Sequence, residues 1–347
     1  MKKITILIKP VSSSCNMQCE YCFYKDVSQY RDINSKLMSQ KTIHTIIEKV
    51  FNIQQSAMQV EFCFQGGEPL LAGIDFYRYF ISIVNKVNKI HTISFSIQTN
   101  GILINQEWVD FFKQYHFLVG VSLDGVEEVH DYYRIINKEN THKEIVKGIT
   151  LLQKNSIDFN ILSVITPKMS TYAKEIYHFY KTMNYKYIQF IPCLPFLDGT
   201  GGLKPKEYAR FYKELYDEFI NDKSIHIDLF EQIALLKRGV KECSCGMLGY
   251  CSFQFVMEAN GDIFPCDFYA IDKYRLGNIH NIDLKDIMTN QRLSLFLTED
   301  KCFSNLCDHC QYYKMCQGQC KRQNVCLFDD DYCGYQDLLK YIDKIDI

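Results

Sequence analysis

The feature that most constrains the fold is an alternation of two kinds of segment over the first two hundred or so residues. Short runs of β-branched and aromatic residues predict buried strands at 4–8, 60–64, 93–98, 118–123, 159–165 and 187–191. Between them, helical periodicity predicts helices at 40–51, 74–87, 106–115, 143–154 and 172–183, with Ser39 and Asn105 as N-caps. Repeated strand–helix units predict an α/β fold, a parallel sheet curved into a partial or full barrel of six strands.

Polar and glycine-rich motifs follow the predicted strands directly. They are the cysteine loop at 15–22, Gly66-Gly67-Glu68, Thr99-Asn100-Gly101 and Asp124-Gly125. In barrels made of strand–helix units, the loops after the strands carry the function. We therefore expect these motifs to converge on one rim of the barrel.

The first of these loops holds three cysteines, Cys15, Cys19 and Cys22, with the spacing C-x3-C-x2-C. Three thiolates can hold three irons of a [4Fe–4S] cluster, which leaves the fourth iron open to a ligand that is not protein. Neighbouring aromatic residues, Tyr21 and Tyr24 among them, would shield such a cluster from solvent. Packing cysteines or a partial zinc site are the alternatives.

A second set of cysteines lies near the C-terminus, where eleven of the sixteen follow residue 242. Cys245, Cys251 and Cys266 bracket a predicted hairpin at 253–259 and 262–265, for which Asn260-Gly261 predicts a type I′ turn. Downstream, the thiols at 307, 310, 316 and 320 are followed by Cys326 and Cys333. Two groups of four could hold two further clusters, with a zinc ribbon as the alternative and Cys326 as a possible replacement for Cys333.

Composition excludes several other classes of protein. The net charge is −2 over 347 residues and no dense basic block occurs, so no nucleic-acid partner is expected. The apolar runs are too short for a membrane span. Closely spaced cysteines without an export signal predict a reducing cytoplasm. We expect a barrel at 1–204, a helical linker at 205–242 with helices at 205–221 and 227–238, and a cysteine-rich domain at 243–347.

The cysteine triplet and Gln65-Gly-Gly-Glu-Pro69 together resemble radical S-adenosylmethionine (SAM) enzymes. The resemblance implies that SAM chelates the open iron and is cleaved, on reduction, to methionine and a 5′-deoxyadenosyl radical. Arg134 is one of the residues that would bind SAM; the alternative is that it forms a surface salt bridge. The SAM-binding residues that it implies are Tyr21, Gly66, Gly67, Glu68, Asn100, Ser122, Asp124 and Arg134.

The C-terminal cysteines resemble the SPASM domain, an auxiliary-cluster module of radical SAM enzymes that modify peptides and proteins. By position, the resemblance assigns one cluster to Cys245, Cys251, Cys266 and Cys320. It assigns another to Cys307, Cys310, Cys316 and Cys333. With the N-terminal triplet, this implies three [4Fe–4S] clusters.

The segment from Cys266 to Tyr269, followed by Arg275-Leu-Gly-Asn278, resembles the anaerobic sulfatase-maturating enzymes. The resemblance implies that Asp267 is the catalytic base and that Tyr24 and Gln65 line the substrate site. The expected reaction converts a Cys or Ser in an unfolded sulfatase segment to Cα-formylglycine, with an electron donor such as ferredoxin or flavodoxin. The alternatives are a SPASM enzyme that forms a thioether or other crosslink in a ribosomal peptide, and a non-catalytic electron carrier or zinc-binding protein.

Overall fold

A computed structural model of the chain describes residues 2–32, 36–241 and 244–345. In this part of the chain ten strands form one sheet, in the order β12-β11-β10-β1-β2-β3-β4-β7-β8-β9. All six predicted strands are confirmed, and they pair in parallel with their neighbours. Their bounds are β1 Lys2–Ile8, β2 Met58–Phe64, β3 Thr92–Thr99, β4 Leu118–Ser122, β7 Phe159–Ile165 and β8 Tyr187–Pro192.

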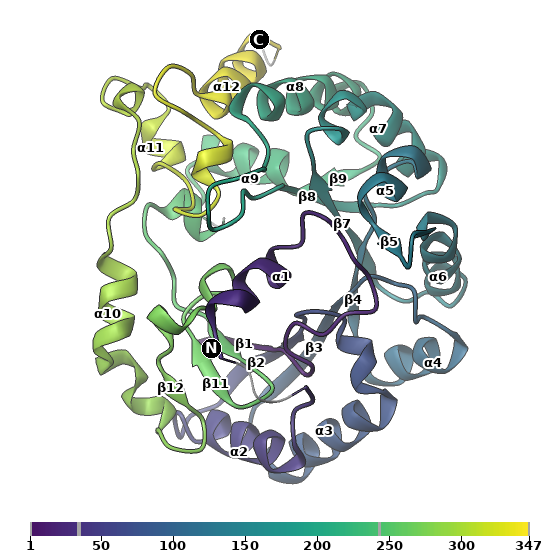
Figure 1. Ribbon diagram of the computed structural model, residues 1–347, viewed down its shortest axis with the longest axis vertical. Helices are drawn as coiled ribbons and strands as arrows, with labels where there is room; N and C mark the ends of the chain where they lie inside the picture. Colours follow the sequence, from purple (N-terminus) through teal and green to yellow (C-terminus); the bar gives the residue numbers. More distant parts are fainter. Residues whose placement is uncertain (1, 33–35, 242–243, 346–347) are drawn as a thin grey trace.

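The crossover helices lie on the outer face of this curved sheet, and α1 (Phe23–Val27) lies on its inner side (Figure 1). Ser39 and Asn105 cap their helices as predicted, because each side chain accepts a hydrogen bond from a backbone N–H of the first turn. The helices between the barrel strands are α2 Gln40–Phe51, α3 Ile74–Val87, α4 Gln106–Tyr115, α5 Glu127–Tyr133, α6 His142–Lys154 and α7 Ala173–Thr182.

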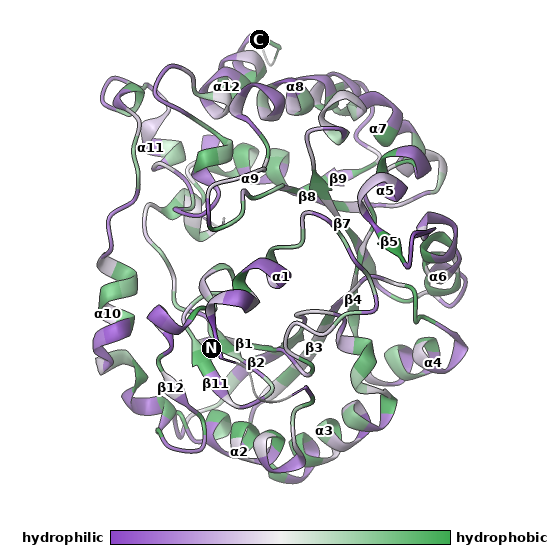
Figure 2. Cartoon of the chain, viewed as in Figure 1, coloured by the Kyte–Doolittle hydropathy of each residue, from purple (hydrophilic) through white to green (hydrophobic). Residues whose placement is uncertain are grey.

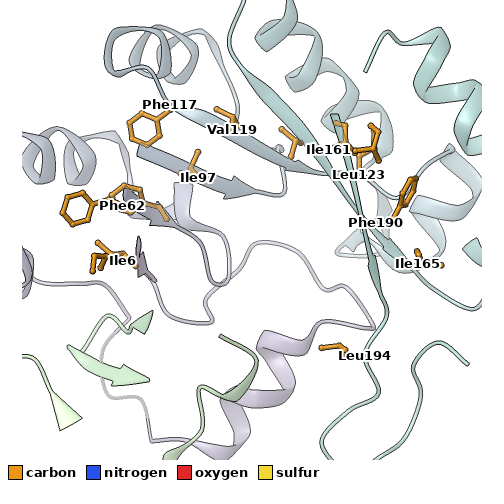
Figure 3. Close-up of a cluster of buried hydrophobic side chains, with 14 of the residues drawn as sticks. Ile6, Phe62, Ile97, Phe117, Val119, Leu123, Ile161, Ile165, Phe190 and Leu194 are labelled. Carbon is orange, nitrogen blue, oxygen red and sulfur yellow. The ribbon is translucent and has the colours of Figure 1, made fainter. Parts of the chain in front are cut away.

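The core of the barrel lies between the sheet and its helices. Along β2 the side chains alternate, so Val60, Phe62 and Phe64 are fully buried while Glu61 and Cys63 on the other face are partly accessible. Figure 3 shows this buried layer, and Figure 2 shows helices with both apolar and polar residues. Each fully buried apolar side chain contributes about 1.5–3 kcal/mol. The other face of the sheet therefore remains available for polar chemistry.

The C-terminal region extends the barrel sheet. Strand β10 (Phe255–Met257) pairs in parallel with β1, and the antiparallel strands β11 (Asp262–Phe264) and β12 (Gly277–Asn278) follow it outward. The predicted hairpin is confirmed, but the predicted type I′ turn is wrong. Of Asn260 and Gly261 only the glycine has positive φ, at 87°, whereas type I′ needs two such residues. The connection is longer, with the Gly261 N–H donating to the Glu258 carbonyl.

The described part of the chain has further helices and short strands, both in the barrel and in the C-terminal region. The predicted boundary at 242/243, with Cys243, lies outside the described residues, so the domain limits stay a prediction. None of the helices in the described ranges has the length and apolar character to cross a membrane. These elements are β5 Ile135–Ile136, β6 Glu139–Asn140, α8 Pro205–Asn221, β9 His226–Ile227, α9 Asp228–Lys237, α10 Gln291–Thr298, α11 Tyr313–Cys316 and α12 Gly334–Ile345.

Candidate active site

The three N-terminal cysteines lie on the loop between β1 and α1. The Cys19 sulfur is within electrostatic range of the Cys15 and Cys22 sulfurs. Burial raises the pKa of the Cys19 thiol to about 12, and the Arg134 guanidinium opposes that rise. Cys15 is exposed, and the other two are partly so. Three thiols gathered on one loop are a donor set that suits a [4Fe–4S] cluster.

The glycine pair holds this loop against the end of β2. The Gly67 N–H donates to the Ser12 carbonyl at 2.8 Å, and the Glu68 N–H donates to the Ser14 carbonyl at 2.8 Å. A Cβ on Gly67 would lie 2.0 Å from the Ser14 oxygen, so no other residue fits this approach. Gly66 has a φ of 119°, which also favours glycine. The two glycines therefore allow the backbone of the cysteine loop to approach the end of β2. That these glycines also contact SAM stays a prediction.

Glu68 is fully buried, and its carboxylate joins two strand ends. It accepts hydrogen bonds from the Leu70 N–H at 2.9 Å, the Thr99 hydroxyl at 2.8 Å and the Asn100 N–H at 2.7 Å. Burial raises the pKa of Glu68 to about 7. The Asn100 amide donates to the Asn16 side chain at 2.8 Å and lies 3.7 Å from the Cys15 sulfur. Glu68 thus positions Asn100 beside the cysteine loop.

Asp124 and Arg134 form a buried ion pair beside Cys19 of the cysteine loop. The Arg134 Nε lies 2.8 Å from Asp124 Oδ2, which also accepts from the Tyr21 hydroxyl. Arg134 is 7% exposed, so the alternative of a surface salt bridge is wrong. Its guanidinium also lies 3.9 Å from the Cys19 sulfur. Ser122 ends β4, two residues before Asp124, and is partly accessible.

Asp267 occupies the centre of a second group of polar side chains. Its Oδ2 accepts from the Tyr24 hydroxyl at 2.6 Å and from the Gln65 amide at 3.0 Å. Its Oδ1 lies 2.7 Å from the Lys9 ammonium. The Tyr24 hydroxyl is also within electrostatic range of Cys22, so this group borders the cysteine loop. The structure therefore brings together Tyr24, Gln65 and Asp267, which are far apart in the sequence.

Sequence reasoning missed the charged residues behind Asp267. Lys9 also lies 3.1 Å from Glu258, which lies 2.8 Å from Arg31. A lysine directly before Pro10, at the end of a buried strand, was the available signal. The partners Glu258 and Arg31 give no local pattern that could have identified them.

Eight of the C-terminal thiols form two sets of four. Cys320 lies within electrostatic range of Cys245, Cys251 and Cys266 although it follows them by more than fifty residues. Burial raises the pKa of Cys266 and Cys320, and the neighbouring thiols raise it further. This set matches the grouping that the resemblance implies.

The other set surrounds a small cavity lined by Cys307, Cys310, Cys316 and Cys333. Burial raises the pKa of Cys316 to about 12, with the other three thiols acting in the same direction. Cys326 is fully buried elsewhere, where its thiol donates to the Cys193 carbonyl at 3.4 Å. Within the described ranges no three Cys, His, Asp or Glu side chains converge tightly enough for a single metal ion.

The fold, the open cysteine loop and the second cysteine region define a class of protein. Residues 10–179 match the radical SAM superfamily, and residues 245–320 match an iron-sulfur cluster-binding domain, SPASM. The chain is thus a radical SAM enzyme that uses SAM and iron–sulfur clusters.

Similar proteins then define the family within that class. The chain is 38% identical to the cysteine-type anaerobic sulfatase-maturating enzyme of Clostridium novyi (strain NT), over 93% of this chain and 89% of that protein. It is 30% identical to the serine-type enzyme of Bacteroides thetaiotaomicron, over 98% and 87%. The solved structure of native anSMEcpe with bound AdoMet and Cp18Cys peptide superposes with a TM-score of 0.88 at 32% identity, covering 99% of this chain and 97% of that one. The chain belongs to the anaerobic sulfatase-maturating enzymes.

Proposed function

We propose that this enzyme oxidises a cysteine side chain in an extended sulfatase segment to Cα-formylglycine. The carrying observation is the convergence of Tyr24, Gln65 and Lys9 on the Asp267 carboxylate, beside the cysteine loop. The choice of cysteine over serine is supported by the 38% identity to a cysteine-type relative, against 30% to a serine-type one.

The three sets of thiols support a proposal for the cofactors. Cys15, Cys19 and Cys22 would hold the cluster that binds SAM, and the two C-terminal sets would hold two auxiliary clusters, three in all. When bound, these groups supply one-electron chemistry: reductive cleavage of SAM, hydrogen-atom abstraction at the substrate Cβ, and uptake of the electron that remains. Around SAM we assign Tyr21, Gly66, Gly67, Glu68, Asn100, Ser122, Asp124 and Arg134, in part by positioning one another.

The chain's own contribution is proton transfer and orientation. Asp267 Oδ2 takes the proton of the substrate thiol, while Tyr24 and Gln65 hold that oxygen toward the substrate. The side chain loses two hydrogens overall, which gives a thioaldehyde, and water then releases hydrogen sulfide and leaves the aldehyde. We further propose a cytoplasmic setting with ferredoxin or flavodoxin as the electron donor, because the clusters need a reducing supply.

The test is anaerobic incubation of the reconstituted enzyme with SAM, a reductant and two peptides that differ only in Cys or Ser. Conversion of the Cys peptide replaces hydrogen sulfide by one oxygen in the mass spectrum. A faster loss of two hydrogens from the Ser peptide would contradict the cysteine preference. A loss of two hydrogens with sulfur retained would indicate a thioether crosslink and reject the proposed activity.

A further inference from the structure

Behind the candidate base lies a row of four charged side chains that alternate in sign. Arg31 Nη1 lies 2.8 Å from Glu258 Oε1, and that oxygen lies 3.1 Å from Lys9 Nζ. The same ammonium lies 2.7 Å from Asp267 Oδ1. The Lys9 and Glu258 residues are 0% and 1% exposed. Two positive and two negative groups thus make a neutral, buried cluster.

The fold places these groups together through the pairing of β1 with β10. Ile8 and Met257 are register partners, so the residues that follow them, Lys9 and Glu258, emerge side by side. The Lys9 N–H also donates to the Met257 carbonyl at 2.8 Å. Arg31 comes from the segment after α1, where its guanidinium also donates to the Ala270 carbonyl at 2.9 Å.

Burial makes the geometry of this cluster restrictive. A buried ammonium costs free energy unless it is paired, which favours a fixed position of the Lys9 ammonium between the Glu258 and Asp267 carboxylates. It also lies 4.8 Å from the centre of the Tyr24 ring. The cation therefore contacts both Asp267 and one of the groups that donates to its other oxygen. Rotation of the Asp267 carboxylate would break contacts on both sides.

We propose that Lys9 is a positioning residue for the oxidation, and that Glu258 and Arg31 hold it in place. The ammonium binds Oδ1 of Asp267 and so turns Oδ2 toward the substrate thiol. Lys9 does not contact the substrate. The proposal rests on the proposed function in one respect, which is that Asp267 takes the substrate proton.

The decisive variant is the double change Lys9→Met with Glu258→Gln. It removes one positive and one negative charge, so the charges of Arg31 and Asp267 still cancel and the buried cluster stays neutral. The variant should therefore fold, and a loss of activity then reports on the position of Asp267. With the Cys peptide we expect kcat to fall about 100-fold and KM to change little, while reductive SAM cleavage continues without product. Lys3→Met is the matched control, because Lys3 lies on β1, the strand that leads to Lys9, its side chain is 58% exposed and it pairs with Glu61.

A double-mutant cycle with Asp267→Asn provides a readout that a purely structural role would not change. If Lys9 acts through Asp267, adding the paired Lys9 and Glu258 changes to Asp267→Asn lowers product formation no further. Additive losses, a parental kcat in the paired variant, or failure of that variant to fold and bind iron would each reject the positioning role. If the parental enzyme converts neither peptide, the proposed function is rejected. The premise of the cycle, that Asp267 takes the substrate proton, is then rejected with it.

Discussion

The barrel and the C-terminal region reach their folds by different means. In the barrel, the parallel strands have five to eight residues and most of the helices between them have ten to fourteen, as β4, β3, α4 and α3 illustrate. From residue 245 onward, short 3-10 turns predominate, and strands such as β10 and β12 have only three and two residues. The second region instead gathers eight thiols in two sets.

This difference indicates which forces stabilise each region. Burial of apolar side chains between sheet and helices is enough for the barrel. A region of short elements with clustered thiols gains much of its free energy of folding from metal binding, as other cysteine-rich modules do. The barrel should therefore keep its fold without clusters, whereas the C-terminal region should not.

The largest effect is expected from changing Cys15, Cys19 and Cys22 together to Ala. SAM cleavage should disappear, and iron content should fall by about a third because one of the three proposed clusters loses its thiolates. Far-UV circular dichroism should remain that of the parent, since the barrel does not depend on this cluster. Cys193→Ala is the control. Retained SAM cleavage, or loss of barrel structure, would break the contrast.

Asp267→Asn tests whether the C-terminal region also contributes chemistry to the barrel. Product formation should fall by about 10²- to 10⁴-fold, the usual contribution of a proton-transfer group, while SAM cleavage persists. Mass spectrometry of the peptide and chromatography of 5′-deoxyadenosine measure the two together. Asp198→Asn, in the exposed loop after β8, should behave as the parent. Equal product from both variants would remove Asp267 from the reaction.

Two buried thiols allow a matched comparison within the C-terminal region. Cys316→Ala should lose about a third of the iron and make this region sensitive to protease, because Cys316 belongs to a thiol set. Cys326→Ala should keep its iron and lose only about 1 kcal/mol of stability, as an ordinary core change. The opposite pattern would place Cys326 in the outer set in place of Cys333.

The smallest effect concerns Glu68 in the barrel alone. Its pKa of about 7 in the folded protein exceeds the usual 4.5, so the native state holds the proton more tightly. Stability of the cluster-free protein should thus fall as pH rises from about 4.5 to 7, by at most ~3 kcal/mol, and then level off. Urea unfolding across this range measures it, and Glu68→Gln should flatten the profile. An unchanged slope in that variant would assign the effect to another group.

Local patterns predicted the barrel closely because its determinants are local. Helices α2 and α4 begin where Ser39 and Asn105 cap them, and buried strands alternate with them at every step. Helix α5 and strands β5 and β6 escaped prediction because segments this short have no measurable periodicity. The pairing of β10 with β1 also escaped, since partners about 250 residues apart leave no local pattern.

The candidate site was predicted in its motifs and missed in its support. Tyr24, Gln65 and Asp267 were identified through resemblance, and the structure brings them into contact. Spacing alone could not have joined Cys320 to the upstream thiols. The contact between Lys9 and Glu258 became recognisable only once two strand ends were adjacent in space.

The pairing of β1 with β10 also has a consequence for synthesis on the ribosome. Strand β1 gains β2 on one side early, but its other neighbour lies near residue 255 and leaves the exit tunnel much later. Until β10 has been synthesised, one edge of β1 therefore has unpaired backbone amides and carbonyls, which can pair wrongly with other nascent chains. We expect a chaperone to assist folding of the nascent chain until β10 has been synthesised.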